Sequence, residues 1–155
     1  MSLVTEHLQR RGAAFIAIPH AKTFTSLEEA EAIGVHADEV LKTVVLDTEH
    51  GHALAVIPGS RRLDLHLVEE AVGDPHAHLA SEAELRVDFP EIELGAMPPM
   101  GSVVGAPMFV DPEVLDHETV LFAAGKETES VRMRTDDLFR GEVMTVAPLV
   151  RDEEY

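Results

Sequence analysis

The centre of the chain reads Leu41-Lys42-Thr43-Val44-Val45-Leu46, then Asp47-Thr48-Glu49-His50-Gly51, and then Ala53-Leu54-Ala55-Val56-Ile57. Two apolar, β-branched runs around a short polar segment with a glycine predict a β-hairpin. Pro58-Gly59 ends the second strand. Lys42 is the only lysine within an apolar strand. Burying it is costly without an anionic or polar partner, so Lys42 is a candidate ligand-binding cation. The alternative is a strand-edge lysine whose ammonium reaches solvent.

The flanking sequence predicts a mixture of helices and strands. Capping residues and terminal glycines indicate helices at 3–11, 26–33, 63–72 and 136–140. A capping box that begins at Ser81 indicates a further short helix before Phe89. Short apolar runs indicate further strands at 13–18, 103–104, 108–110, 119–123, 130–133 and 143–146. Strands that outnumber helices and adjoin through short turns favour an α+β fold, with a curved, mixed, largely antiparallel sheet flanked by helices. We expect a single domain over residues 1–155, with a frayed acidic tail at 151–155.

Composition narrows the classes of function. The 155 residues include no cysteine, which excludes disulfides, thiolate catalysis and thiolate metal sites. The formal net charge of -17 should repel nucleic acid over most of the surface, so any such contact needs a local basic patch. No apolar run is long enough to span a bilayer, and no signal peptide is evident at the N-terminus. We therefore expect a cytoplasmic protein with no DNA or membrane partner.

The loop Gly95-Ala96-Met97-Pro98-Pro99-Met100-Gly101 is the second candidate site element. Proline stiffens its middle and glycine frees its ends, so the loop could present backbone amides to a ligand. The alternative is a tight surface turn. With Lys42, the loop indicates a site for a small ligand or an acyl group.

The histidines and acid pairs elsewhere in the sequence indicate a functional site less strongly. His50 with His52, and His76 with His78, have no clear third ligand and are interpreted as solvated turn histidines. His20 differs because it follows a strand end, where site residues often lie. The acid pairs Glu28/Glu29, Glu69/Glu70 and Asp136/Asp137 are interpreted as solvated helix faces. No nucleophile elbow, Walker loop or Rossmann fingerprint is present.

Several separate segments together resemble the YbaK/prolyl-tRNA synthetase-associated editing-domain family. They are Leu41 to Val45, Leu54 to Pro58, Leu63 to Leu65, Leu79 to Ser81, Gly95 to Gly101, Ala124 to Lys126 and Val131 to Met133, leading to Asp137-Leu138. Each is weak alone, but their order and spacing over residues 10 to 145 make the joint resemblance strong. Members of this family hydrolyse the ester of a mischarged aminoacyl-tRNA, most often on proline tRNA, without a metal or other cofactor.

The resemblance implies roles for individual residues. Lys42 matches the family's essential lysine and would anchor the 3′ end of the tRNA; Gly95 matches the key loop glycine, whose neighbouring amides would hold the ester carbonyl. The substrate-binding candidates are His20, Ala96, Met97, Pro98, Gly101, Ala124, Gly125 and Ser130. At Ser130 other members carry an acid or a histidine, so amino-acid specificity could differ or activity could be lower. Met97, Met100 and Ala124 would line a small apolar pocket.

The implied function is a trans-editing deacylase that acts on the acceptor end of aminoacyl-tRNA, with prolyl-tRNA synthetase as a candidate partner. Two alternatives stay open. One is a catalytically weak or inactive binding module of the same fold, which Ser130 and the acidity would favour. The other is a hydrolase of small acyl esters.

Overall fold

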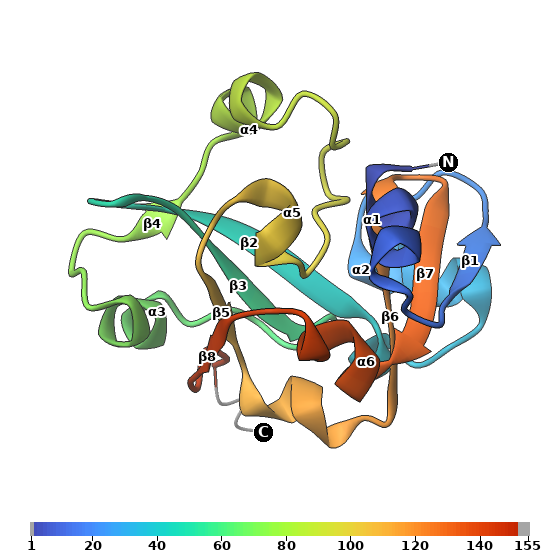
Figure 1. Cartoon of the computed structure of the whole chain (residues 1–155). Helices are drawn as coiled ribbons and strands as arrows, with labels where there is room; N and C mark the ends of the chain where they lie inside the picture. The colour runs from blue at the N-terminus through green and yellow to red at the C-terminus, as the bar shows by residue number, and fades with distance from the viewer. Residues whose placement is uncertain (1, 152–155) are drawn as a thin grey trace.

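The computed structural model describes residues 2–151, and the acidic tail beyond Arg151 lies outside the described residues. Helices, 3-10 helices and strands alternate along the chain in the order α1 (Leu3–Arg11), β1 (Ile16–Pro19), α2 (Ser26–Ile33), η1 (Ala37–Glu39), β2 (Leu41–Thr48), β3 (Gly51–Pro58), α3 (Leu65–Val72), β4 (His78–Leu79), α4 (Glu82–Asp88), α5 (Gly101–Val104), β5 (Met108–Val110), η2 (Pro112–Asp116), β6 (Thr119–Lys126), β7 (Glu129–Arg134), α6 (Thr135–Arg140) and β8 (Met144–Val146). Figure 1 shows this α+β arrangement, with the β2–β3 hairpin at its centre.

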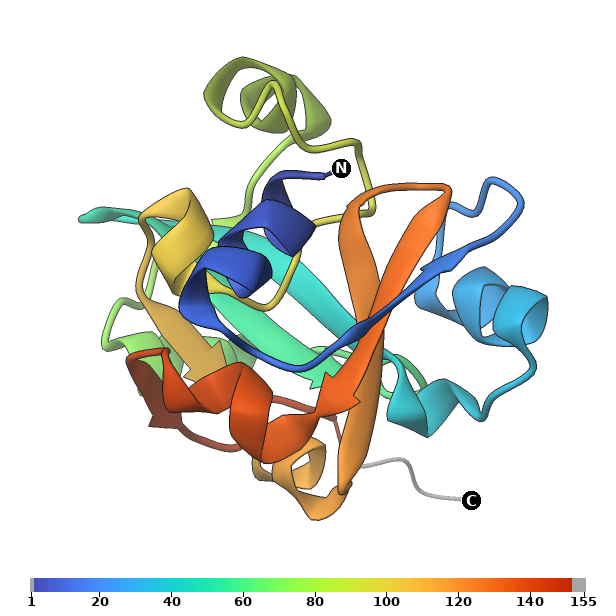
Figure 2. The ribbon, with the colours of Figure 1, turned by 45° about the vertical axis from the view of Figure 1, so that its right-hand side comes forward.

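The strands form two sheets rather than one curved sheet. The larger has the order β4-β2-β3-β5-β8 and is mixed, because β5 is parallel to β3 and β8 whereas β2 is antiparallel to β3 and β4. The smaller is antiparallel, with the order β1-β7-β6. A single parallel bridge between Val40 and Leu121 connects the start of β2 to β6. The predicted fold class is confirmed, and the two sheets meet at the end of β2 that carries Lys42 (Figure 2).

Strand β3 is buried on both faces, which explains its unbroken apolar sequence. Leu54 and Val56 face the main core between the sheets, where Phe122, Val131 and Leu138 also pack. Ala55 and Ile57 face a second core under α3, with Val68 and Leu149. Both faces of the hairpin are therefore fixed, and so is its register, which pairs Lys42 with Ile57 and Asp47 with His52.

Two local predictions were wrong. Val103 and Val104, expected in a strand, lie in the short helix α5 between Gly101 and Gly105. Four residues are too few to display a helical period, so the β-branched pair was misleading. The sequence of Ser26 to Glu29 predicts a capping box that begins at Ser26, but helix α2 is capped by Thr25. The Thr25 side chain accepts from the Glu28 amide, and Glu28 accepts from the Phe24 amide.

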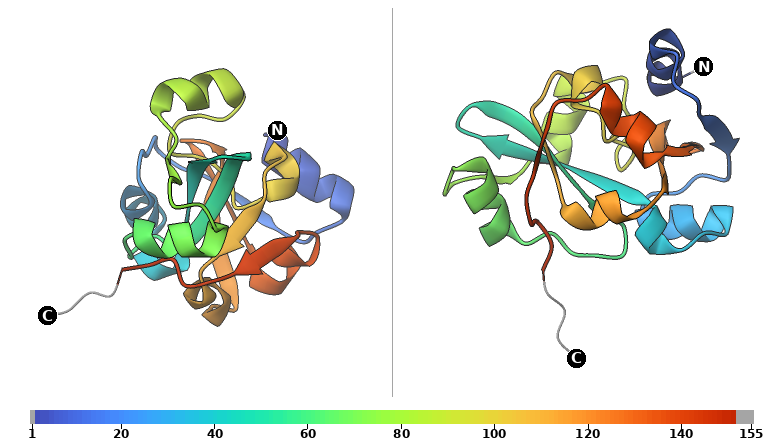
Figure 3. Two further views of the ribbon diagram at one scale, coloured as in Figure 1. Left: turned by 90° about the vertical axis from the view of Figure 1, so that its left-hand side faces the viewer. Right: turned by 60° about the horizontal axis from the view of Figure 1, so that its bottom comes forward.

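Helix α4 projects from the rest of the molecule in the left-hand view of Figure 3, although Leu85 packs against the main core. None of its residues is buried. It begins with the predicted capping box of Ser81 and Glu84 and leads into the Gly95 loop. Within residues 2–151, none of the helices has both the length and the apolar character required to cross a membrane.

Candidate functional site

A cavity of about 350 Å³ opens where the start of β2 faces α2 and the Gly95 loop. Its wall includes Phe24, Glu29, Lys42, Thr43, Gly95 and Met97. A second, wider hollow of about 640 Å³ adjoins it, since Phe24 and Gly95 line both. The sequence-predicted lysine and loop glycine therefore share one cavity although they are 53 positions apart in the chain.

Lys42 reaches this cavity from a strand edge. Strand β4 pairs with β2 only at Leu46 and Asp47, which leaves the start of β2 uncovered on that side. The residue is exposed, and it has no ion-pair partner among residues 2–151. The ammonium thus avoids the burial cost considered for it from the sequence, and it can receive an anionic or carbonyl group.

Gly95 fixes the close approach of its loop to the other wall of the cavity. Its φ is +80°, and a Cβ built there would lie 2.6 Å from the carbonyl oxygen of Phe24. No side chain fits that gap, so only glycine lets the loop lie against Phe24. The Ala96 amide is occupied, because it donates to the Glu93 carbonyl at 3.0 Å. Within the described part of the chain, the amides of Gly95, Met97, Met100 and Gly101 have no acceptor, and of these four residues only Gly95 and Met97 line the cavity.

The loop is held in place by a bulge in β6. The register of β6 against β7 shifts between Ala123 and Lys126, and this shift frees the backbone of Gly125. The Gly125 amide donates to the Ala96 carbonyl at 3.0 Å, and the Gly125 carbonyl accepts from the Glu93 amide at 2.9 Å. Gly125 and Ala96 are therefore joined to each other, and their hydrogen bonds support the loop from behind.

A chain of polar side chains, buried at Glu29 and Ser130 and partly exposed at His20, runs beside the cavity. Ser130 is fully buried and its hydroxyl donates to the Glu29 carboxylate. His20 Nε2 lies 2.8 Å from Ser130 Oγ, and His20 Nδ1 lies 2.7 Å from the Ala21 carbonyl oxygen. A carbonyl only accepts, so Nδ1 carries a proton. The Ser130 hydroxyl therefore links the Glu29 carboxyl to the His20 ring.

Burial raises the pKa of the Glu29 carboxyl above its ordinary value, while the hydrogen bond from Ser130 and the nearby His20 act in the opposite direction. Glu29 is only 4% exposed, so the expectation that it lies on a solvated helix face was wrong. The missed signal was its position three residues after Ser26 and four before Ile33, on the inward stripe of α2.

Except for Met97, the remaining sequence candidates lie behind the cavity wall rather than on it. Met97 lines the cavity, but Ala96, Pro98 and Gly101 are buried. Met100 and Ala124 belong to the main core, and Ala123 is the residue of β6 that faces the cavity. Gly101 packs tightly, since a Cβ there would meet the Ala106 carbonyl oxygen at 2.5 Å.

Comparison with known proteins agrees with this arrangement. The sequence model of the aminoacyl-tRNA editing domain matches residues 20–140, a range that begins at His20 and contains both cavity walls. The chain belongs to the aminoacyl-tRNA editing domain family.

Three individual relatives are 25%, 26% and 28% identical to this chain. A protein of Enterococcus faecalis named "Putative Cys-tRNA(Pro)/Cys-tRNA(Cys) deacylase EbsC" is 26% identical over 105 residues, which span 67% of this chain and 63% of that protein, just under two thirds of its length. A solved structure described as "a putative trans-editing enzyme for prolyl tRNA synthetase" has a TM-score of 0.83 and 28% identity, covering 97% of this chain and 96% of that one. A "hypothetical protein" of known structure has a TM-score of 0.87 and 25% identity, covering 97% and 100%.

Proposed function

We propose that this protein is a trans-editing aminoacyl-tRNA deacylase, which hydrolyses the ester that joins a small amino acid to a mischarged tRNA, proline tRNA being the first candidate. The observation that carries the proposal is the meeting of an unpaired lysine and two free backbone amides at one small cavity, in a chain of the editing-domain family. In the reaction, water adds to the ester carbonyl, the acyl C–O bond breaks, and the ribose oxygen leaves with a proton.

The two site elements have separate tasks in this proposal. Lys42 binds a phosphate or ribose oxygen of the terminal adenosine by charge-assisted hydrogen bonds. The Gly95 and Met97 amides donate to the carbonyl oxygen as negative charge develops on it. No metal takes part. The cavity of about 350 Å³ favours small aminoacyl groups, and exclusion by size discriminates by about 1–3 kcal/mol per methylene.

The adjoining hollow supplies a place for the nucleotide. Phe24 is 59% exposed at the boundary between the two hollows, and Arg86 lines the wider one. An exposed aromatic ring is a stacking surface for a base, and an arginine is a phosphate ligand. A contact limited to the acceptor end is compatible with the net charge of -17, and a synthetase that delivers the tRNA would lessen the electrostatic cost further.

Glu29 provides recognition of the amino acid. Its carboxylate lines the cavity, and an aminoacyl ester carries an α-ammonium group that a carboxylate binds. The family resemblance implies an acid or a histidine at position 130, where this chain has serine. Glu29 and His20, both hydrogen-bonded to Ser130, would supply the missing ionisable groups from neighbouring elements.

The first test is deacylation of proline tRNA charged with alanine, serine, cysteine or proline. We expect release of a small residue and sparing of proline. Lys42→Ala should lower kcat/KM by roughly 10- to 150-fold, the value of a hydrogen bond to a charged group. Arg10→Ala, which removes an exposed charge on α1, is the matched control and should leave the rate unchanged. Full turnover by Lys42→Ala would remove the mechanism, and no turnover by wild type on any substrate would favour the binding module.

The role of Glu29 has its own test, in which the charge is removed from each partner in turn. Acetylation of the α-amino group should slow wild type, because the carboxylate loses its cation. In Glu29→Gln the free and acetylated esters should react at similar, low rates. If acetylation slows both proteins by the same factor, Glu29 does not contact the α-ammonium group.

A further inference from the structure

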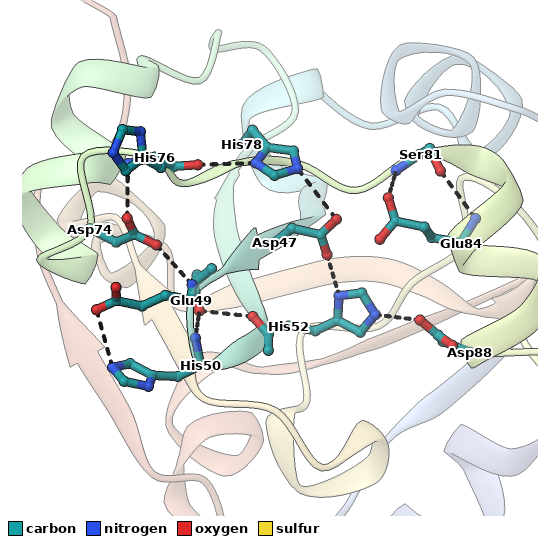
Figure 4. A network of polar contacts seen from close by, with 12 residues as sticks. Asp47, Glu49, His50, His52, Asp74, His76, His78, Ser81, Glu84 and Asp88 are labelled. Atoms are coloured by element: carbon teal, nitrogen blue, oxygen red, sulfur yellow. Dashed lines mark hydrogen bonds and ion pairs between the residues drawn. The ribbon is translucent and has the colours of Figure 1, made fainter.

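Away from this cavity, a cluster of histidine and carboxylate side chains joins the tip of the β2–β3 hairpin to α4 (Figure 4). Three of its members lie abreast on neighbouring strands: His78 on β4 pairs with Asp47 on β2, which pairs with His52 on β3. Residues directly opposite each other on adjacent strands point to the same face of the sheet. Glu84 and Asp88 approach from α4, where their spacing of four residues puts them on one helix face.

The distances within the cluster are short. Asp47 Oδ1 lies 2.7 Å from His52 Nδ1, and Asp47 Oδ2 lies 3.5 Å from His78 Nε2. Single donor atoms of Asp47, His52 and Glu84 all lie within 4.8 Å of one another. Oxygen and nitrogen atoms that close can bind one ion, since metal–ligand bonds to such atoms measure about 2.0–2.2 Å.

Hydrogen bonds outside the cluster's centre fix which ring nitrogens face it. His78 Nδ1 lies 3.0 Å from the His76 carbonyl oxygen, which only accepts, so this nitrogen carries the proton. His52 Nε2 lies 2.7 Å from Asp88 Oδ2, again an acceptor. In their neutral forms both rings therefore direct a lone pair at Asp47. Carboxylates and carbonyls that orient histidines in this way are typical partners of metal-binding imidazoles.

With both rings neutral, the centre gathers acceptors without donors. Two imidazole lone pairs and the carboxylates of Asp47 and Glu84 converge, and His52 Nδ1 is buried with no hydrogen bond of acceptable geometry despite its 2.7 Å approach to Asp47. Acceptors this close need a cation between them, which is either a metal ion or a proton on the His52 ring. The expectation that His52 is a solvated turn histidine was wrong: its side chain is only 20% exposed and its ring packs on Phe89 at 5.3 Å between centroids.

We propose that Asp47, His52 and Glu84, with His78 as a fourth ligand, bind one divalent transition-metal ion of the zinc class. Mixed imidazole and carboxylate ligands suit Zn²⁺ better than Ca²⁺ or Mg²⁺, which prefer oxygen alone. The ion fastens α4 to the hairpin, in addition to the packing of Leu85 and Phe89 against the main core. Asp47 is five residues from Lys42 along β2, about 17 Å in an extended strand, so the metal has no part in ester hydrolysis.

The test is Zn²⁺ titration of the EDTA-treated full chain by calorimetry, with Co²⁺ absorption as a second readout. We expect one ion per chain and at least about tenfold weaker binding in Glu84→Gln and in His52→Gln. Glu84→Gln keeps an oxygen for the Ser81 cap, so α4 should still form. The matched control is His66→Gln, which alters an exposed histidine beside Glu69 and Glu70 on α3 and should bind Zn²⁺ like wild type.

Each outcome bears on the proposal. Loss of binding in the two cluster variants but not in His66→Gln supports it, as does a Zn²⁺-induced shift of the His52 Nδ1 resonance in a ¹⁵N spectrum. Absence of stoichiometric binding, or equal weakening by His66→Gln, overturns it and leaves ring protons as the cations that hold the cluster. Because binding is measured directly, the result is independent of whether deacylation is the reaction.

Discussion

Replacement of Gly95 by alanine tests whether the approach of the loop to Phe24 builds the site. This substitution lowers the free energy of unfolding for two reasons. A non-glycine residue at a φ of +80° is strained by about 1–2 kcal/mol, of which the stiffer unfolded chain offsets about 0.4–1 kcal/mol. The new Cβ would also lie 2.6 Å from the Phe24 carbonyl oxygen, and relief of such overpacking costs about 1–3 kcal/mol.

Gly73→Ala is a matched control because it separates the two costs. Gly73 has a φ of +77° at the end of α3, and a Cβ there would meet nothing within 4 Å. Gly73→Ala should therefore lower the free energy of unfolding by about 0.5–1 kcal/mol, and Gly95→Ala by about 2–4 kcal/mol. At roughly 3 °C per kcal/mol, the losses in Tm are roughly 2–3 °C and 6–12 °C.

The assay combines thermal unfolding with deacylation at a temperature at which both variants are folded. Gly95→Ala should lose roughly 10- to 100-fold in kcat/KM, because its free amides shift relative to Lys42, whereas Gly73→Ala should match wild type. Equal losses of Tm in the two variants would show that the loop has room to move. A destabilised Gly95→Ala with full activity would show that the loop amides do not hold the carbonyl.

The remaining predictions concern buried carboxylates. Because the pKa of Glu29 is raised in the folded protein, its contribution to stability is present below about pH 4.3 and is lost as pH rises through the folded pKa. Glu29→Gln should therefore gain stability over wild type as urea unfolding is moved from pH 4 to pH 7, and a pH-independent difference would contradict this. Asp74 is the opposite case: it accepts from the amides of His76 and Glu49, which lower its pKa, so its stabilisation is present above about pH 3.9 and is lost as pH falls through the folded pKa. Asp74→Ala should lower Tm at pH 7 and have a diminishing effect in acid, and an equal loss of Tm at both pH values would exclude this linkage.

Local signals in the sequence predicted most of the elements. The hairpin follows from two β-branched runs around a glycine-containing turn, and the start of α4 follows from the capping box of Ser81 and Glu84. These features depend on residues three or four positions apart, and sequence patterns detect interactions over that separation. The way the two sheets meet depends on the Val40–Leu121 bridge, whose partners are 81 positions apart, and no local pattern encodes it.

The candidate site likewise contains residues that the sequence predicts and residues that it does not. Lys42 and the Gly95 loop were predictable because each is unusual among its immediate neighbours. Glu29 was missed because it adjoins Glu28 in an acidic pair, although its spacing from Ile33 places it on the inward stripe of α2, which packs over Ser130 on β7. The His52 cluster was also missed because its members come from β2, β3, β4 and α4, so no spacing in the sequence unites them.

The family resemblance implies an acid or a histidine at position 130, where this chain has serine. Read from the sequence, serine removes a charge from the pocket. In the folded protein the Ser130 hydroxyl lies between Glu29 and His20 and is hydrogen-bonded to both. In the proposed reaction, an α-ammonium group bound at Glu29 would favour the ionised form of that carboxyl, against the burial that raises its pKa. Glu29 would then supply the ionisable group at the cavity that serine at position 130 does not.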